Sequence, residues 1–367
     1  MGDYAGMVVL SGRAVGRATL ARQMLVGRAE VPVVEAVGRL VGMQGQEAKH
    51  PYVGLWSRVD GFVEGDLDRA VADREVVRGT LFRGTLHLVT AADYLRFRGT
   101  VAPVLEAGLR MLKERAEGMD PVAVVAAAER ILKKEPLTFT EVRDALQAEF
   151  PAVNERALGF CTRMMVPLVV YPTGVRWGWP ANARFTPAEA WLGKKLHRKE
   201  EQGELVVRYL QAFGPATPAD FQTWSGLSKA KPVFDSLDLE VFTDDNGKTL
   251  YDVPDAPRPD PDTVVPVRFL PEFDNLLLAH AKRERIIADA HRPAVFTKNL
   301  RVKATYTVDG LVGGLWTAEK KRGVATLTLT PFGRLLKRDR VELEREGTAL
   351  LGFLEPDAKT YEVVTGS

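Results

Sequence analysis

Apolar residues recur at helical spacing near the start of the chain and then give way to a β-branched run. Apolar spacing predicts three helices and two strands there: helices over 17–26, from 33 to about 43 and over 53–59, and two strands within 76–90. We expect Pro51 to stop any helix past His50, because its ring does not fit inside a helix. Three helices followed by two strands are the order of a winged helix-turn-helix, so residues 8–118 predict one such unit.

The same order recurs twice. Residues 119–200 predict helices and a hairpin: helices over 121–132, from Thr138 onward and over 153–166, and the hairpin over 169–179. Residues 201–260 predict a third set: helices over 204–212, after Thr217 and over 228–237, and paired strands over 239–253 around Asn246-Gly247, a strong hairpin signal. Three such units in a row favour a repeated architecture.

A Pro- and Asp-rich stretch, residues 255–262, marks a boundary before a different kind of sequence. Beyond it, apolar and polar residues alternate over much of 263–367, which predicts strands over 304–312, 314–316 and 324–330. A turn is predicted at Asp309-Gly310 and a charged helix over 331–353. The predicted fold class is therefore α+β, with three tandem winged helix-turn-helix motifs and a C-terminal β-rich part over 263–367.

Composition sets broad limits. The chain has 367 residues, too many for one ordinary core, with 46% hydrophobic and 27% charged residues. We find no apolar run long enough to span a bilayer and no signal-peptide pattern. Cys161 stands alone and suits a reducing compartment, so we expect a cytoplasmic protein without disulfides.

Net charge is only +2, so the distribution of basic residues matters more than their sum. Basic clusters predicted to contact the phosphate backbone lie in the C-terminal part: Lys282, Arg283, Arg285, Lys298, Arg301 and Lys303, and at a hairpin tip Lys320, Lys321 and Arg322. A further cluster occupies 194–199. An ordinary solvated surface explains any single cluster equally well.

Gln44-Gly45-Gln46 falls where the second helix gives way to a loop. Side-chain amides both donate and accept hydrogen bonds, and Gly45 permits a turn that brings them together. The alternative is that these are ordinary polar residues closing a helix, and a tripeptide by itself is a weak signal.

Arg83, Thr85 and His87 alternate along a predicted strand and would share a face toward DNA, although a histidine such as His87 is more often part of the core. The polar run Asp274-Asn275, with His280 beyond it, predicts a structured turn; a role near the substrate and a helix cap at Asp274 both stay open.

Tryptophans and histidines were considered as base-stacking and metal-binding residues. We expect Trp56 and Trp191 in the core, whereas Trp177 and Trp179 on the second hairpin are candidates for stacking on or wedging between bases. The histidines show no metal-ligand spacing and Cys161 is isolated, so we expect no metal site.

Several segments together resemble one family, the bacterial winged-helix DNA glycosylases of the AlkZ and YcaQ type. The similar segments are spread over nearly the whole chain: 11–23, 40–46 (LVGMQGQ), 51–58 (PYVGLWSR), 82–89 (FRGTLHLV), 270–280 (LPEFDNLLLAH) and 309–316 (DGLVGGLW). The resemblance implies three tandem winged-helix motifs, no metal, no cofactor, and a catalytic Gln-x-Gln formed by Gln44 and Gln46. The middle residue of that motif is usually aliphatic in the family and is Gly45 here.

The chemistry that the resemblance implies is consistent with these residues. A neutral amide is a poor general base, but two amides can orient a water beneath an anomeric carbon. Such a site needs an activated leaving group, and N7- or N3-alkylation gives a purine the positive charge that supplies it. We therefore expect a monomeric, monofunctional DNA glycosylase that acts on double-stranded DNA with alkylated purines, including bulky adducts or interstrand crosslinks, in base excision repair or in self-resistance.

The alternative is a non-catalytic winged-helix DNA-binding protein. A regulator would recognise a defined sequence and usually dimerise, and the chain shows no heptad for a dimer helix. A lesion-binding protein would hold damaged DNA without releasing a base. Base release is the property that separates both from an enzyme.

Overall fold

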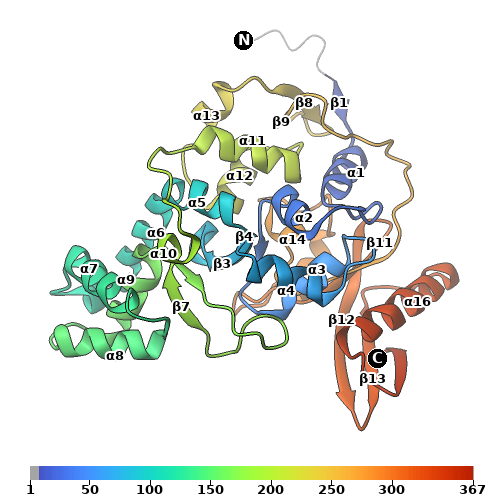
Figure 1. Cartoon of the computed structure of the whole chain (residues 1–367). Helices are drawn as coiled ribbons and strands as arrows, with labels where there is room; N and C mark the ends of the chain where they lie inside the picture. The colour runs from blue at the N-terminus through green and yellow to red at the C-terminus, as the bar shows by residue number, and fades with distance from the viewer. Residues whose placement is uncertain (1–7, 367) are drawn as a thin grey trace.

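The computed structural model describes residues 8–366, and among them helices are combined with three sheets, so the α+β prediction is confirmed (Figure 1). Elements of the first segment are β1 (Val9–Leu10), α1 (Gly12–Arg22), α2 (Val33–Arg39), β2 (Met43–Gln44), α3 (Lys49–Trp56), α4 (Glu64–Ala72), β3 (Val76–Thr80), the 3-10 turn η1 (Phe82–Gly84), β4 (Leu86–Thr90), α5 (Ala91–Thr100), α6 (Ala102–Leu109) and the 3-10 turn η2 (Arg110–Ala116). The two strands within 76–90 are confirmed.

Helix boundaries in this segment differ from the prediction for local reasons. α1 begins earlier because the Ser11 hydroxyl accepts the Ala14 N–H at 3.2 Å and caps the helix. The expectation that Pro51 ends a helix is wrong, since α3 runs through it. Pro51 lies in the first turn, where a backbone N–H would have no acceptor within the helix, so its missing donor costs nothing. α4, α5 and α6 were not predicted.

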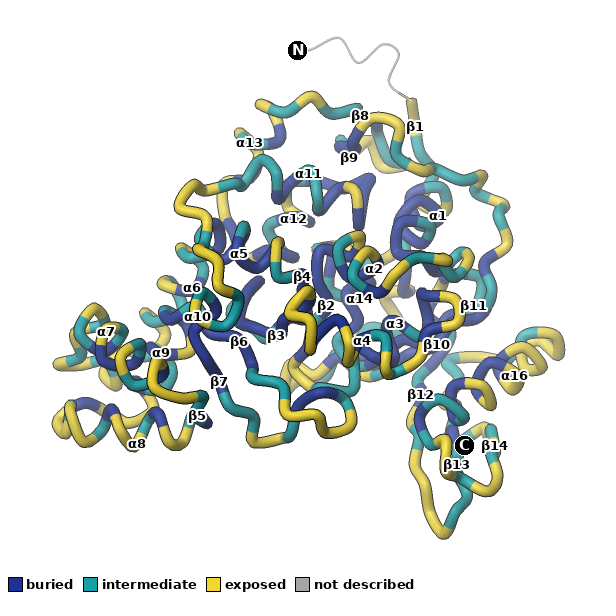
Figure 2. Tube along the Cα trace, viewed as in Figure 1, coloured by how far each residue is buried: buried dark blue, intermediate teal, exposed yellow. Residues whose placement is uncertain are grey.

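The second segment contains α7 (Pro121–Leu132), β5 (Leu137–Thr138), α8 (Phe139–Glu149), α9 (Glu155–Met165), β6 (Leu168–Val170), β7 (Arg184–Pro187) and α10 (Ala188–Leu192). The hairpin predicted over 169–179 is wrong in its second strand, because β6 pairs with β7 across an irregular loop. Trp177 and Gly178 both have positive φ in that loop, which interrupts a strand. α7–α9 project at the left of Figure 1, and each has a buried face as well as exposed residues (Figure 2).

The third segment contains α11 (Gln202–Phe213), α12 (Pro218–Ser225), α13 (Lys231–Asp235), β8 (Glu240–Asp244) and β9 (Thr249–Asp252). The hairpin around Asn246-Gly247 is confirmed, with antiparallel pairing from Glu240–Asp252 to Thr243–Thr249. The order of three helices and a hairpin therefore occurs here as the sequence pattern indicates.

Neighbouring segments share their sheets. β3 and β6 pair at Gly79 and Val169, which joins two hairpins into one sheet of order β2-β4-β3-β6-β7-β5. Gly79 is required at this junction, since a Cβ there would lie 2.8 Å from the Leu168 carbonyl oxygen. β1 pairs in parallel with β8, so the N-terminal strand completes the sheet of the third segment.

The C-terminal part follows residues 255–262, which form no helix or strand. Its elements are β10 (Arg268–Leu270), α14 (Asn275–Leu278), the 3-10 turn η3 (Asp289–His291), α15 (Arg292–Val295), β11 (Thr305–Val308), β12 (Leu311–Lys321), β13 (Val324–Pro331), α16 (Lys337–Leu354) and β14 (Thr360–Thr365). The strands form one sheet in chain order, and α16 packs against β10, β13 and β14. The chain turns at Asp309-Gly310 as predicted, but 311–321 is one strand rather than two.

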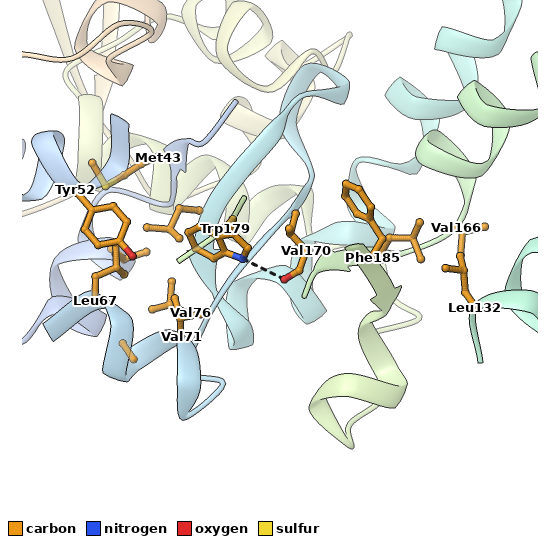
Figure 3. Packing of buried hydrophobic residues seen from close by; sticks show 14 of the residues in the cluster. Met43, Tyr52, Leu67, Val71, Val76, Leu132, Val166, Val170, Trp179 and Phe185 are labelled. Carbon is orange, nitrogen blue, oxygen red and sulfur yellow. Dashed lines mark hydrogen bonds between the residues drawn. The ribbon is translucent and has the colours of Figure 1, made fainter. Parts of the chain in front are cut away.

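A shared core lies beneath β2 and the helices around it. Met43 and Tyr52 are buried there with Leu67 and Val71 (Figure 3). Trp179 reaches the same core, and its indole N–H donates to the Val170 carbonyl oxygen at 3.3 Å. Met43, the residue just before the Gln-Gly-Gln motif on β2, is therefore fixed in the core. No helix within residues 8–366 combines the length and apolar character that a membrane crossing requires.

Candidate active site

The Gln-Gly-Gln motif begins at the end of β2, which lies antiparallel to β4 with Gln44 opposite His87. The Gly45 N–H donates to the Leu86 carbonyl oxygen at 2.8 Å and extends this pairing by one residue. Gln44 is half-buried and Gln46 is exposed. The motif is therefore a strand end that presents two amides at different depths.

Arg78 holds the backbone of the motif from the neighbouring strand β3. Its Nε donates to the Gly45 carbonyl oxygen at 2.6 Å and its Nη2 to the Gln46 carbonyl oxygen at 2.8 Å. The guanidinium lies 5.4 Å from the Trp179 ring centre, and burial lowers its pKa to about 10. Two charge-assisted bonds to consecutive carbonyls fix the direction of the strand end.

Gly45 has a different role from the one expected. Its φ lies outside the left-handed region, whereas Val41 and Gly42 just before the motif have φ of 53° and 95°. A Cβ on Gly45 would lie 3.2 Å from the Leu88 backbone nitrogen. The glycine therefore permits close approach to β4, and the turn occurs earlier in the chain.

A narrow cleft opens beside Gln44, and the segment 271–275 forms its far wall. The residues lining it are Gln23, Leu40, Met43, Gln44, His50, Arg58, Pro271, Glu272, Phe273, Asp274 and Asn275. Both carboxylates among them bind arginines. Asp274 accepts two bonds from Arg58, at 2.9 and 2.7 Å, and Glu272 accepts one from Arg301 at 2.5 Å.

The segment 271–275 is fixed by buried polar contacts. Asp274 caps α14 by accepting the Leu276 N–H at 2.9 Å, as one of the two sequence hypotheses proposed. The Arg58 and Asp274 side chains are each only 1% exposed, so this pair is a true interior ion pair. Asn275 Nδ2 donates to the Gly42 carbonyl oxygen at 2.5 Å and connects the segment to the turn before the motif.

His50 forms another part of the cleft, at the start of α3. Its ring centre is 6.4 Å from that of Phe273. Burial lowers its pKa to about 4, outweighing the attraction of Glu272, and Lys49, Arg301 and Arg78 lower it further. The imidazole is therefore neutral at neutral pH.

Arg83 lies next to Gln44, but not on a strand as expected. It is in η1 with φ of 53°, its Nη1 donates to the Trp224 carbonyl oxygen, and its Nη2 donates to Gln44 Oε1 at 3.4 Å. Burial lowers its pKa to about 10. Thr85 donates to the Phe82 carbonyl oxygen and does not share a strand face with Arg83.

His87 is 1% exposed and packs edge-on against Phe82 at 5.2 Å. Burial lowers its pKa to about 3. Its place is in the interior behind Gln44, which agrees with the core role left open by the sequence.

The basic residues of 282–303 lie in two environments. Arg283 Nε donates to the Leu277 carbonyl oxygen at 2.7 Å and Arg285 Nη1 to the Pro215 carbonyl oxygen at 2.8 Å, so both guanidinium groups hold the backbone together. Exposed side chains in this stretch include Lys282, Lys298, Arg301 and Lys303. Through its bond to Glu272, Arg301 brings the loop 297–303 next to the cleft.

Lys320, Lys321 and Arg322 lie at the tip of the β12–β13 hairpin, as predicted. The hairpin projects from the body at the lower right of Figure 1. Lys320 bonds to Glu355 at 2.8 Å and Asp357 at 2.7 Å, and the Asp357 hydrogen bond raises its pKa. The structure therefore does not bring this group together with the Gln-Gly-Gln motif.

The two tryptophans considered as base-stacking elements are packed within the protein. Trp177 meets Tyr52 edge-on at 5.0 Å and also contacts Phe353, while Trp179 is 3% exposed. Both connect the 171–183 loop to the rest of the molecule. Across the part of the chain that the structure describes, no three His, Cys, Asp or Glu side chains gather as metal ligands.

Sequence reasoning missed Arg78, Arg58 and His50 as parts of the site. Arg78 carried one usable signal, a charge inside the β-branched run Val76–Thr80 that predicts a buried strand. A buried charge requires a partner. Nothing in the local sequence identified that partner as the backbone of the motif.

Comparisons with known proteins give a consistent result. A family model described as DNA glycosylase AlkZ-like matches residues 37–353. The chain is 28% identical over 335 residues to a protein of Streptomyces sahachiroi named interstrand DNA cross-link repair glycosylase, covering 85% of this chain and 88% of that protein. The solved structure of Streptomyces sahachiroi DNA glycosylase AlkZ matches with a TM-score of 0.80 at 23% identity, covering 97% of this chain and all of that one. At that identity the structural match speaks for the fold alone.

Proposed function

Since the chain belongs to the AlkZ-like DNA glycosylase family, we propose that it hydrolyses the N-glycosidic bond of N7- or N3-alkylated purines in double-stranded DNA. Gln44 and Gln46 hold the attacking water. The observation that carries this proposal is the Gln-Gly-Gln strand end, with two amides presented by a backbone that Arg78 clamps.

The charge state of the site supports a cationic leaving group. The two carboxylates that line the cleft beside Gln44 are both bonded to arginines, so neither is available as a strong base there. Amides orient a water but activate it weakly. The purine must then leave readily, and a positive charge from alkylation makes it do so, because departure neutralises it. A neutral lesion such as uracil lacks this advantage.

Bulky adducts and interstrand crosslinks are part of the proposal. The curated relative is named for crosslink repair, and the match covers most of both chains. Exposed basic residues of the loop next to the cleft, Lys298 and Lys303, and Lys282 nearby in sequence are suited to bind phosphates. We also assign phosphate contacts to the hairpin tip of Lys320, Lys321 and Arg322.

We further propose a monomeric, monofunctional enzyme of the cytoplasm that works without metal or cofactor. The base is displaced by water rather than by an enzyme nucleophile, so the product is an abasic site with an unbroken strand. Residues 8–118, 119–200 and 201–260 act as three winged-helix units, and 263–367 as an additional DNA-contacting part.

Base release from matched duplexes tests the proposal. One duplex carries a single N7-methylguanine and the other a single uracil at the same position. We expect release of N7-methylguanine at least 100-fold faster than of uracil, with strand breakage only after alkali. DNA binding without release of N7-methylguanine or of a bulky N7 adduct would contradict it and favour the non-catalytic alternative.

A further inference from the structure

Two residues that line the cleft beside Gln44 each have a buried polar atom without a hydrogen-bond partner. Asn275 is 5% exposed, and the bond from its Nδ2 to the Gly42 carbonyl oxygen fixes which way the amide faces. Its Oδ1 is buried and has no hydrogen-bond partner among residues 8–366, and the same holds for Nδ1 of His50. The side chains of both residues line this one cleft, and Nδ1 is an acceptor when the neutral His50 ring carries its proton on Nε2. Two buried acceptors without a protein donor require a ligand that donates.

The width of the cleft restricts that ligand. The space is wide enough for about one water molecule and far too narrow for a purine. A cation is disfavoured because the Arg58 guanidinium lines the same cleft. A single water, with two hydrogens to donate, satisfies both acceptors.

Gln44 adds a hydrogen-bond donor at the mouth of the cleft. Its Oε1 accepts from Arg83 at 3.4 Å, which leaves its Nε2 hydrogens to donate elsewhere. Gln44 and His50 are half-buried, whereas Asn275 and Asp274 are buried, so the cleft opens on the side of Gln44.

We propose that this cleft seats the hydrolytic water before attack, with its hydrogens accepted by Asn275 Oδ1 and His50 Nδ1 and its oxygen accepting an N–H of Gln44. Gln46, which is exposed and outside the cleft, meets the same water as it moves out to the anomeric carbon. The inference rests on the glycosylase function proposed above and adds two residues to it. Asn275 is a positioning residue, and His50 is the proton acceptor. One lone pair of the water remains free to attack.

Hydrolysis exchanges the bond from the anomeric carbon to the purine for a bond to the water oxygen. The water oxygen forms a bond to the anomeric carbon while the carbon–nitrogen bond to the purine breaks. The electron pair of that bond stays with the cationic purine and neutralises it. The water proton passes to the neutral imidazole of His50 and then to solvent, leaving an abasic hydroxyl. Since the base departs neutral, the positive charge develops on the sugar and the attacking water, whose proton becomes strongly acidic, so a weak base is sufficient.

Single-turnover kinetics with saturating enzyme and an N7-methylguanine duplex test this assignment. His50→Phe and Asn275→Leu keep approximate shape but remove the acceptor, and Asn275→Asp keeps an oxygen. We expect the first two to slow base release about 10- to 100-fold, with the DNA dissociation constant unchanged within twofold. Asn275→Asp should recover at least tenfold over Asn275→Leu. His291→Phe, at a histidine stacked on Phe332, is the matched control and should retain the wild-type rate.

Imidazole rescue provides a readout that does not depend on the fold of the Asn275 variants. His50→Ala leaves space for added imidazole, which we expect to restore rate at least fivefold. Wild-type rates in His50→Phe and Asn275→Leu, or no rescue by imidazole, would overturn the assignment while wild-type release keeps the glycosylase function intact. Failure of the wild type itself to release the base would instead overturn the function.

Discussion

The clamp made by Arg78 gives the sharpest prediction about how the motif works. Arg78→Met keeps much of the apolar stem but removes both donors to the Gly45 and Gln46 carbonyl oxygens. A hydrogen bond to a charged group contributes about 1.5–3 kcal/mol, so the two together set an upper limit of about 3–6 kcal/mol. Gln46 is exposed and its carbonyl oxygen gains access to water. We therefore expect a loss of about 2–3 kcal/mol in the free energy of unfolding.

The catalytic effect should exceed the stability effect. A reacting group displaced by about 1 Å loses on the order of 100-fold in rate, because the geometry for attack is lost. We expect single-turnover base release by Arg78→Met to fall about 30- to 100-fold, while the DNA dissociation constant stays within threefold. Urea denaturation, fluorescence anisotropy and product analysis give the three quantities on the same preparation.

Arg74→Met is a matched control. Arg74 also donates to a backbone carbonyl, that of Trp191 at 2.8 Å, and also lies over that tryptophan ring, at 4.2 Å. It is exposed and outside the site, so its variant should keep the wild-type rate. If a folded Arg78→Met releases base within threefold of wild type, the clamp does not position the motif and the reasoning is refuted.

Three further predictions concern the same region. Gly45→Ala places a Cβ 3.2 Å from the β4 backbone, so we expect about tenfold slower base release and a change in unfolding free energy below about 1 kcal/mol. An unchanged rate would show that β4 shifts to accommodate the methyl group without disturbing the motif. Arg58→Met leaves Asp274 buried without its partner and should cost about 3–5 kcal/mol in urea denaturation, and a cost below about 1 kcal/mol would argue against a structural role. Burial lowers the pKa of His87 and of His280 to about 3 each and that of His50 to about 4, so all three take up protons on unfolding, and the unfolding free energy should fall by about 2–3 kcal/mol from pH 6.5 to 5.5; a flat profile in that window would contradict this.

The sequence was sufficient for features that depend on neighbouring residues. Helical spacing located most helices, and the Asn246-Gly247 turn located the β8–β9 hairpin. These features are encoded within a few residues, where propensity and turn chemistry act. The prediction that Pro51 stops a helix was wrong because, in sequence alone, a proline in the first turn of a helix looks the same as a proline that ends one.

The site depends on contacts between distant segments, and these were not predictable. Asn275 reaches Gly42 across 233 positions, and Arg58 meets Asp274 across 216. The sheet that positions β2 also depends on the pairing of Gly79 with Val169. Each such pairing is decided by the packing of the whole chain, which one sequence does not reveal. The resemblance to a family pointed to Gln44 and Gln46 as candidates, but not to the side chains that contact the Gln-Gly-Gln segment.

Whether the two amides hold the attacking water is tested by comparing the wild type with Gln44→Ala and Gln46→Ala. All three proteins are incubated in excess over a duplex with a single N7-methylguanine, and free base and bound DNA are measured separately. We expect rapid release by the wild type, at least 100-fold slower release by each variant, and equal DNA affinity for all three. Equal release by the wild type and the two variants would contradict the assignment of the water to these amides.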